Sequence, residues 1–293
     1  MSVTLVVVIV AVLAAAGVWA LSREPGHADP VDPEAEERWL IRWLIRHRRF
    51  GAFAQSIDRR AVGGLMLVLA LAIVFVAALA VGLLFDMVDR DRGLAGWDRS
   101  VAEWGSAHAT ERSTELLQLL TDLGGSAYLA VAFAVVAAVD YARRRNPNVP
   151  LFLLVALGGV VLINNGLKLL IDRDRPDVTH LVSAAGSSFP SGHSAAAAAA
   201  WFALALVVGR QWSRRWRAVA AALAAVVTVA VAASRALLGV HWLTDVIAGV
   251  MVGWAWFLLT ALIFGGRLQR LGDPAARAVP TTTVVREPVQ QRS

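Results

Sequence analysis

The sequence contains no cysteine, which excludes disulfide bonds and thiolate metal sites. Lysine is almost absent too: of the 28 basic residues one is a lysine, Lys168, and the others are arginines. Charged residues make up only 17% of the chain, whereas apolar residues make up 57%, a share above that of soluble domains. Because the charges cluster between long apolar runs, the composition indicates a polytopic membrane protein.

The positive charge does not indicate a nucleic-acid-binding protein. The formal net charge is +6, and such a balance can attract nucleic acid. The arginines, however, flank the apolar runs, where they anchor membrane proteins at the cytoplasmic surface. We therefore expect the bilayer, and no nucleic acid, as the partner of these charges.

Seven apolar runs approach the roughly 20 residues that a helix needs to cross the hydrocarbon core of a bilayer. They are Val3–Leu21, Gly63–Phe85, Ser126–Tyr141, Pro150–Ile171, Ser194–Val208, Ala218–Ala233 and Trp242–Phe264. Three of them are short, so we expect their helices to extend into flanking residues. The predicted fold class is all-α, a polytopic membrane helical bundle.

Arginine-rich linkers alternate with linkers that lack this bias. The arginine clusters lie within residues 23–60, 143–145, 210–217 and 267–277. The positive-inside rule places these linkers in the cytoplasm, so the linkers 86–125, 172–193 and 234–241 face outward. The first run could be a cleaved signal peptide, but residues 1–3 carry no positive charge. We favour a retained anchor with its N-terminus outside.

The runs and linkers predict four segments. Residues 1–22 form an N-terminal transmembrane helix, 23–62 a cytoplasmic linker, 63–265 the membrane domain and 266–293 a disordered cytoplasmic tail. Within the linker, arginine recurs every fourth residue over Arg38–Arg46. This repeat predicts a basic amphipathic helix on the anionic inner leaflet, with an ordinary helix packed on the membrane domain as the alternative. We also expect Asp98–Leu120 to be helical.

Three polar clusters stand at the outward ends of the predicted helices. They read K-x6-R-P over Lys168–Pro176, P-S-G-H over Pro190–His193, and S-R-x5-H-x3-D over Ser234–Asp245. The first ends the fourth run, the second opens the fifth, and the third joins the sixth to the seventh. The topology therefore predicts that all three meet at one depth on the outward face.

The residue types suit a tetrahedral phosphate. Lys168, Arg175 and Arg235 supply three positive charges, and arginine forks bind phosphate oxygens in pairs. The amides of Ser191 and Gly192 precede a predicted helix, and a helix N-terminus is a ready anion site. Together these groups predict a phosphate-binding site.

Two histidines then have room for separate roles. His241 and Asp245 are four residues apart, which places them on one face of a helix. The carboxylate can hold one ring nitrogen protonated and leave the other free to attack phosphorus. His193 can protonate the leaving alkoxide and then activate water. A structural His–Asp pair is the alternative for His241 and Asp245.

These three motifs resemble those of the type 2 phosphatidic acid phosphatase superfamily, which also includes bacterial acid phosphatases and vanadium haloperoxidases. The resemblance covers roughly residues 63–264 and every fixed position of the motifs. It implies a six-helix core, here with one extra N-terminal transmembrane helix, and catalysis without metal or other cofactor. It implies His241 as nucleophile, Asp245 as its orienter and His193 as acid. Phosphate-binding roles fall to Lys168, Arg175, Ser191, Gly192 and Arg235.

The expected function is a membrane lipid phosphatase that acts outside the cytoplasm. Its substrate would be a polyprenyl diphosphate (undecaprenyl or decaprenyl) or a phosphatidyl phosphate, and similar bacterial proteins recycle such diphosphates for cell-wall synthesis. The alternatives are a lipid phosphotransferase using the same site, a vanadium haloperoxidase, and a non-catalytic membrane protein. A homo-oligomer is compatible with the sequence.

Several polar residues near the motifs receive no catalytic role. We expect Asp172, Asp174 and Asp177 to be solvated partners of Arg173 and Arg175 rather than a metal site. Asn164 and Asn165, one turn before Lys168, either orient that lysine or bond between helices.

Overall fold

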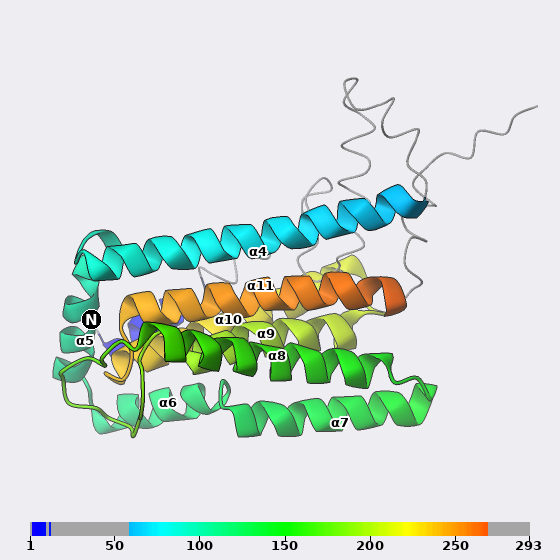
Figure 1. The fold of residues 1–293 in the computed structure, drawn as a ribbon. Coiled ribbons are helices and arrows are strands. Elements are labelled where there is room, and N and C mark those ends of the chain that lie inside the picture. Colours follow the sequence, from blue (N-terminus) through cyan, green and yellow to red (C-terminus); the bar gives the residue numbers. More distant parts are fainter. Residues whose placement is uncertain (1, 10–11, 13–58, 269–293) are drawn as a thin grey trace, which may run out of the picture.

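The computed structural model describes residues 2–9, 12 and 59–268, and these ranges form helices joined by loops without a strand (Figure 1). A first helical segment covers residues 3–9. The further elements are α4 (Arg59–Asp89), the 3-10 helix η1 (Gly93–Trp97), α5 (Asp98–Ala107), α6 (Glu111–Asp122), α7 (Ser126–Arg144), α8 (Asn148–Ile171), α9 (Gly192–Gly209), α10 (Arg214–Leu237) and α11 (Leu243–Leu268). The all-α fold class is confirmed.

Six of the described helices are long and apolar enough to cross a membrane. These spans are Ala70–Asp89, Ser126–Arg144, Asn148–Ile171, Gly192–Gly209, Arg215–Leu237 and Leu243–Phe264. Each overlaps a predicted run, and the three short runs extend at their ends as expected. α7 and α10 take in the flanking arginines because arginine is itself a good helix former.

Helix α9 lies at the centre of the bundle, in contact with α7, α8, α10 and α11 (Figure 1). Its alanine run, Ala195–Ala200, is buried throughout. Small side chains let α11 approach closely: a Cβ on Gly253 would lie 2.1 Å from the carbonyl oxygen of Ala195, and one on Gly249 would lie 2.5 Å from that of Ser191. α11 therefore holds the first turns of α9 through direct backbone packing.

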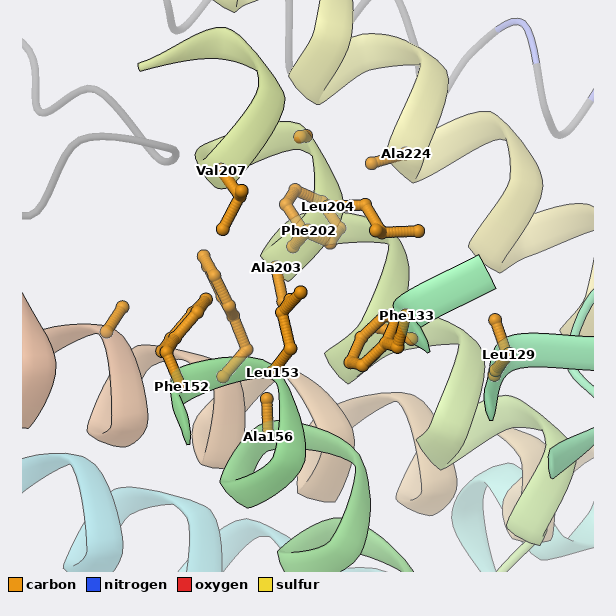
Figure 2. Close-up of a cluster of buried hydrophobic side chains, with 14 of the residues drawn as sticks. Leu129, Phe133, Phe152, Leu153, Ala156, Phe202, Ala203, Leu204, Val207 and Ala224 are labelled. Atoms are coloured by element: carbon orange, nitrogen blue, oxygen red, sulfur yellow. The ribbon is translucent and has the colours of Figure 1, made fainter. Parts of the chain in front are cut away.

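A large apolar cluster fills the space between α7, α8, α9, α10 and α11 (Figure 2). Phe133 from α7 and Phe152 and Leu153 from α8 pack there against Phe202 of α9. The outward face of α4, by contrast, exposes large apolar side chains, among them Leu71 and Phe75, as expected of a lipid-facing surface.

The loops sort to two ends of the bundle. The short α7–α8 and α9–α10 connections, with Arg143–Arg145 and Arg210, define the arginine-rich end. η1, α5, α6, the α8–α9 loop and the α10–α11 turn lie at the opposite end, which we call the site end (Figure 1).

The predicted helix Asp98–Leu120 is two helices. α5 ends at Ala107, and α6 begins after Thr110, whose hydroxyl accepts from the Ser113 amide while the Ser113 hydroxyl accepts from the Thr110 amide. In a continuous helix these two amides would donate to carbonyls of the preceding turn. Here they donate to side-chain hydroxyls instead, so the reciprocal cap marks the start of a new helix.

The first residues of the chain contact the site end. Val3 and Val7 are buried in a cluster with Leu117 of α6, Leu237 of α10 and Val240. The rest of the predicted first transmembrane helix, the Arg38–Arg46 repeat and the tail beyond Leu268 lie outside the described residues.

Candidate active site

A cavity of about 290 Å³ opens at the site end, between the end of α8, the start of α9 and the end of α10. Six of the eight predicted site residues line it: Lys168, Arg175, Gly192, His193, Arg235 and His241. Asn164, Asn165 and Ser183 add uncharged polar groups to the wall. Ser191 and Asp245 lie behind this lining. Residues from all three motifs therefore meet at one cavity, as the order of the helices predicted.

His241 sits in the α10–α11 turn with only 3% of its surface exposed. Its Nδ1 atom lies 3.5 Å from Asp245 Oδ2 and has no hydrogen-bond partner of normal geometry among the described residues. Its Nε2 atom lies 3.5 Å from Arg175 Nη1, on the cavity side. Asp245 is thus the group placed to accept a hydrogen bond from a protonated Nδ1. In that tautomer the Nε2 atom keeps its lone pair, which faces the cations.

The surroundings of His241 keep its ring neutral. Burial lowers the pKa of His241 to about 4; Asp245 opposes this shift, whereas Arg235 and Arg175 reinforce it. At neutral pH the imidazole therefore carries a free lone pair, which is the form that a nucleophile requires.

Asp245, in the first turn of α11, is fully buried. Its Oδ1 atom accepts from Arg173 Nη1 at 2.6 Å, and its Oδ2 atom accepts from the Trp242 amide at 2.9 Å. The second bond is the helix-capping contact in which a side chain at the third helical position reaches back to the residue before the helix. Both carboxylate oxygens are thereby fixed in position.

The three cations reach the cavity from different elements. Lys168, in the last turn of α8, donates to the Ser187 carbonyl at 2.5 Å. Arg175 donates to the carbonyls of Val240 at 2.6 Å and Ala185 at 2.8 Å, and burial lowers its pKa from the usual arginine value. An arginine so held keeps its charge at neutral pH, because its reference pKa exceeds 12.

Arg235 differs from the other two cations in its hydrogen bonding. It is 6% exposed, and one terminal nitrogen donates to the Thr121 hydroxyl at 3.2 Å. Its buried Nε atom has no acceptor within the part of the chain that the structure describes. Unpaired buried donors are rare in folded proteins, and this one belongs to a side chain that lines the cavity together with His241 and His193.

Of the two backbone amides expected to bind phosphate at the start of α9, that of Ser191 is already bonded within the protein. The Ser191 Oγ atom accepts from the Ser194 hydroxyl at 2.9 Å and caps the helix, and the Ser191 amide donates to the Asp245 carbonyl at 3.0 Å. Gly192 faces the cavity, where a Cβ would lie 3.1 Å from Asn164 Nδ2. The structure thus brings Gly192 and His193 to the wall and leaves the Ser191 side chain behind it.

The expected partners of Arg173 and Arg175 were wrong. Arg173 pairs with Asp245 and with Asp98 of α5, and Arg175 bonds to backbone carbonyls, whereas the three aspartates beside the first motif are exposed. Nothing in the sequence distinguishes Asp98, because it is one of eight acidic residues in its linker. Among the described residues no group of three or more His, Asp or Glu side chains is placed to hold a metal ion.

Comparisons with known proteins point to one family. The family model of the PAP2 superfamily matches residues 149–269. Phosphatidylglycerophosphatase B of Bacillus subtilis is 36% identical over 147 residues, which cover 50% of this chain and 72% of that protein. A lipid A 1-phosphatase of Rhizobium johnstonii is 38% identical over 39% of this chain and 46% of its own length.

A solved structure shares the fold. The crystal structure of a transmembrane PAP2 type phosphatidylglycerolphosphate phosphatase from Bacillus subtilis aligns with a TM-score of 0.61 at 28% identity. The alignment covers 67% of this chain and 97% of that one.

Proposed function

The chain belongs to the PAP2 superfamily and is similar to membrane lipid phosphatases within it; we propose that it removes the terminal phosphate of a polyprenyl diphosphate or phosphatidyl phosphate through a phosphohistidine at His241. The observation that carries the proposal is the cavity itself. Two imidazoles and three cations line one hollow, and the Nε proton of Arg235 has no acceptor among the described residues.

The first step transfers the phosphoryl group to the enzyme. His241 Nε2 attacks phosphorus, and a P–N bond forms while the bond to the lipid oxygen breaks. Lys168, Arg175 and Arg235 neutralise the charge that spreads over the phosphoryl oxygens. His193, on the same cavity wall, protonates the departing lipid oxygen. Asp245 stabilises the positive charge that appears on the His241 ring.

The second step returns the enzyme to its starting state. Water attacks the phosphohistidine, and His193 accepts a proton from that water as the new P–O bond forms. The P–N bond breaks, inorganic phosphate leaves, and His241 regains its free Nε2 lone pair.

A lipid substrate suits the position of the cavity. It lies at the end of helices whose outer faces expose large apolar side chains, so a lipid can keep its chains in the bilayer while its headgroup enters. The relatives bear names of phosphatases that act on phosphorylated lipids, phosphatidylglycerophosphate and lipid A. Among the described residues that line the cavity there is no Phe, Tyr or Trp side chain on which a soluble aromatic phosphate could stack.

We place the reaction outside the cytoplasm. The cavity lies at the bundle end opposite Arg143–Arg145 and Arg210, and the positive-inside rule assigns that arginine-rich end to the cytoplasm. With this orientation residues 1–22 remain proposed as an anchor that starts outside, residues 23–62 as a cytoplasmic linker, and residues 266–293 as a cytoplasmic tail.

The test is phosphate release by the purified protein in detergent. The panel contains undecaprenyl diphosphate, phosphatidylglycerol phosphate, phosphatidic acid and a soluble aryl phosphate. We expect release from a lipid phosphate at a higher kcat/KM than from the aryl ester, and no release by His241→Ala with unchanged thermal unfolding. Lipid phosphates left intact by the wild type would overturn the proposal. Transfer of phosphate to added alcohol instead of water would identify a phosphotransferase.

A further inference from the structure

Behind the cavity lies a buried chain of charges, of which the proposed mechanism uses only Asp245. Arg173, in the α8–α9 loop, reaches Asp98 on α5 with one terminal nitrogen and Asp245 on α11 with the other, at 2.8 and 2.6 Å. Asp98 is 4% exposed, and the Arg173 side chain is 16% exposed. Asp98, Arg173 and Asp245 do not line the cavity, and this chain of charges reaches the cavity through the contact between Asp245 and His241.

Both terminal nitrogens and one face of the Arg173 guanidinium are held in place. Nη1 also donates to the Thr244 hydroxyl at 2.8 Å, and the guanidinium carbon lies 5.2 Å from the centre of the Trp242 ring. The Trp242 ring nitrogen donates in turn to the Asp174 carbonyl at 2.8 Å. Two carboxylates and an aromatic face restrict the planar guanidinium to one orientation. The ammonium group of a lysine is not planar and would not be restricted in this way.

Asp98 fixes the far side of this arrangement. Its Oδ1 atom accepts from the Thr244 amide at 2.8 Å, and its Oδ2 atom accepts from the Thr244 hydroxyl at 2.6 Å as well as from Arg173. The carboxylate of α5 therefore caps the first turn of α11 from outside that helix. Since Asp245 lies in the same turn, α5 and the Asp245 carboxylate form one rigid unit.

Asp245 needs such a partner to act on His241. A fully buried carboxylate carries a large desolvation cost unless it is paired. Its distance from His241 Nδ1 is already 3.5 Å, so a small rotation would remove the contact. Arg173 is the cation bonded to this carboxylate, and it bonds the oxygen that does not face His241.

We propose that Arg173, braced by Asp98, is a positioning residue that holds Asp245 against His241 and so keeps Nε2 aimed at the substrate phosphorus. This inference rests on the proposed function of His241. The inference also gives α5 a role in catalysis, because this helix carries Asp98, which holds Arg173. α5 is not one of the membrane-spanning helices.

The test compares Arg173→Ala with the wild type in the phosphate-release assay. We expect kcat to fall about 10- to 100-fold, the range found when a group that orients a catalytic ligand is removed, while KM changes less than about threefold because Arg173 does not line the cavity. Methylguanidinium, which fits the space left by the side chain, should restore part of the lost kcat.

Two further variants separate positioning from folding. Asp98→Asn keeps an acceptor for the Thr244 amide but removes the charge that braces Arg173, so it should lower kcat in the same direction and by less. Glu103→Gln is the matched control, since Glu103 lies on the same helix, is exposed, and pairs only loosely with Arg99 at 3.7 Å. It should keep the wild-type kcat.

The outcomes are distinct. Wild-type kcat in Arg173→Ala would overturn the inference and leave the proposed function intact. A fall in both kcat and thermal stability without methylguanidinium rescue would assign Arg173 a structural role and also overturn it. Absence of phosphate release by the wild type would instead refute the proposed function.

Discussion

Replacing Asp245 with asparagine tests the catalytic pair while nearly preserving side-chain volume. In the native protein Oδ1 accepts from Arg173 and Oδ2 accepts from the Trp242 amide. An asparagine can satisfy only one of these donors with its single oxygen. If its oxygen stays with Arg173, its NH2 group faces Trp242 and His241 and donates to Nδ1, which moves the ring proton to Nε2 and blocks the nucleophile.

The size of the effect follows from the distance. A unit charge 3.5 Å from the ring interacts with the positive charge that develops there by about 5 kcal/mol at an effective dielectric constant of about 20. Loss of that interaction corresponds to a roughly 3,000-fold lower kcat, close to the roughly 10⁴-fold cost of the same change in a serine protease triad.

The assay is phosphate release from a lipid phosphate at saturating substrate, with thermal unfolding as the measure of fold. Asp177→Asn is the matched control, because Asp177 is exposed in the α8–α9 loop. We expect the control to match the wild type. The reasoning would be refuted if folded Asp245→Asn retained more than about a tenth of the wild-type kcat.

Four further outcomes are expected. Because burial lowers the pKa of His241 to about 4, its imidazole ring should stay neutral down to about pH 5 and gain a proton only near pH 4, as followed by NMR of the folded protein without substrate. A His241 ring that titrates near 6.5 would contradict this. His193→Ala should slow lipid alkoxide leaving groups more than aryl ones, and equal slowing would exclude His193 as the acid. Gly253→Ala should lower the unfolding temperature by several degrees, because its Cβ would lie 2.1 Å from the Ala195 carbonyl oxygen and overpacking costs about 1–3 kcal/mol. The control Gly158→Ala should not lower the unfolding temperature, because the space around its Cβ is open. A chelator should leave activity unchanged, whereas loss restored by magnesium would implicate a metal.

The membrane helices were predictable because their signal is local. Apolar runs of helix length must span or be buried, and their order alone brought the ends of α8, α9 and α10 together at one depth. The motif residues could then be placed on one face before any contact was known. His241 and Arg235 were found in this way.

The contacts of Arg173 with Asp98 and Asp245 could not be predicted in the same way. Asp98 and Thr244 are separated by 146 residues, and no periodicity links an acidic residue in one linker to an arginine in another. Arg173 resembles an interfacial anchor in sequence, and its true partners depend on how α5 folds back over the bundle. The break between α5 and α6 was different: Thr110 and Ser113 have the spacing of a reciprocal helix cap, which the sequence already displayed.

Ser191 shows a third case, in which one residue type serves two purposes. A serine before a helix either caps that helix or offers its hydroxyl to a ligand. The hydroxyl caps α9, and only the neighbouring Gly192 reaches the cavity wall. Local sequence does not distinguish these uses, because both place serine at the same position.

The most direct test of the account is to trap the covalent intermediate. Protein mixed with a lipid phosphate labelled in its terminal phosphate is quenched in alkali within milliseconds, and the labelled peptide is identified by mass spectrometry. The account predicts acid-labile, alkali-stable phosphate on His241 of the wild type and none in His241→Ala. Label on any other residue, or turnover without label on His241, would contradict it.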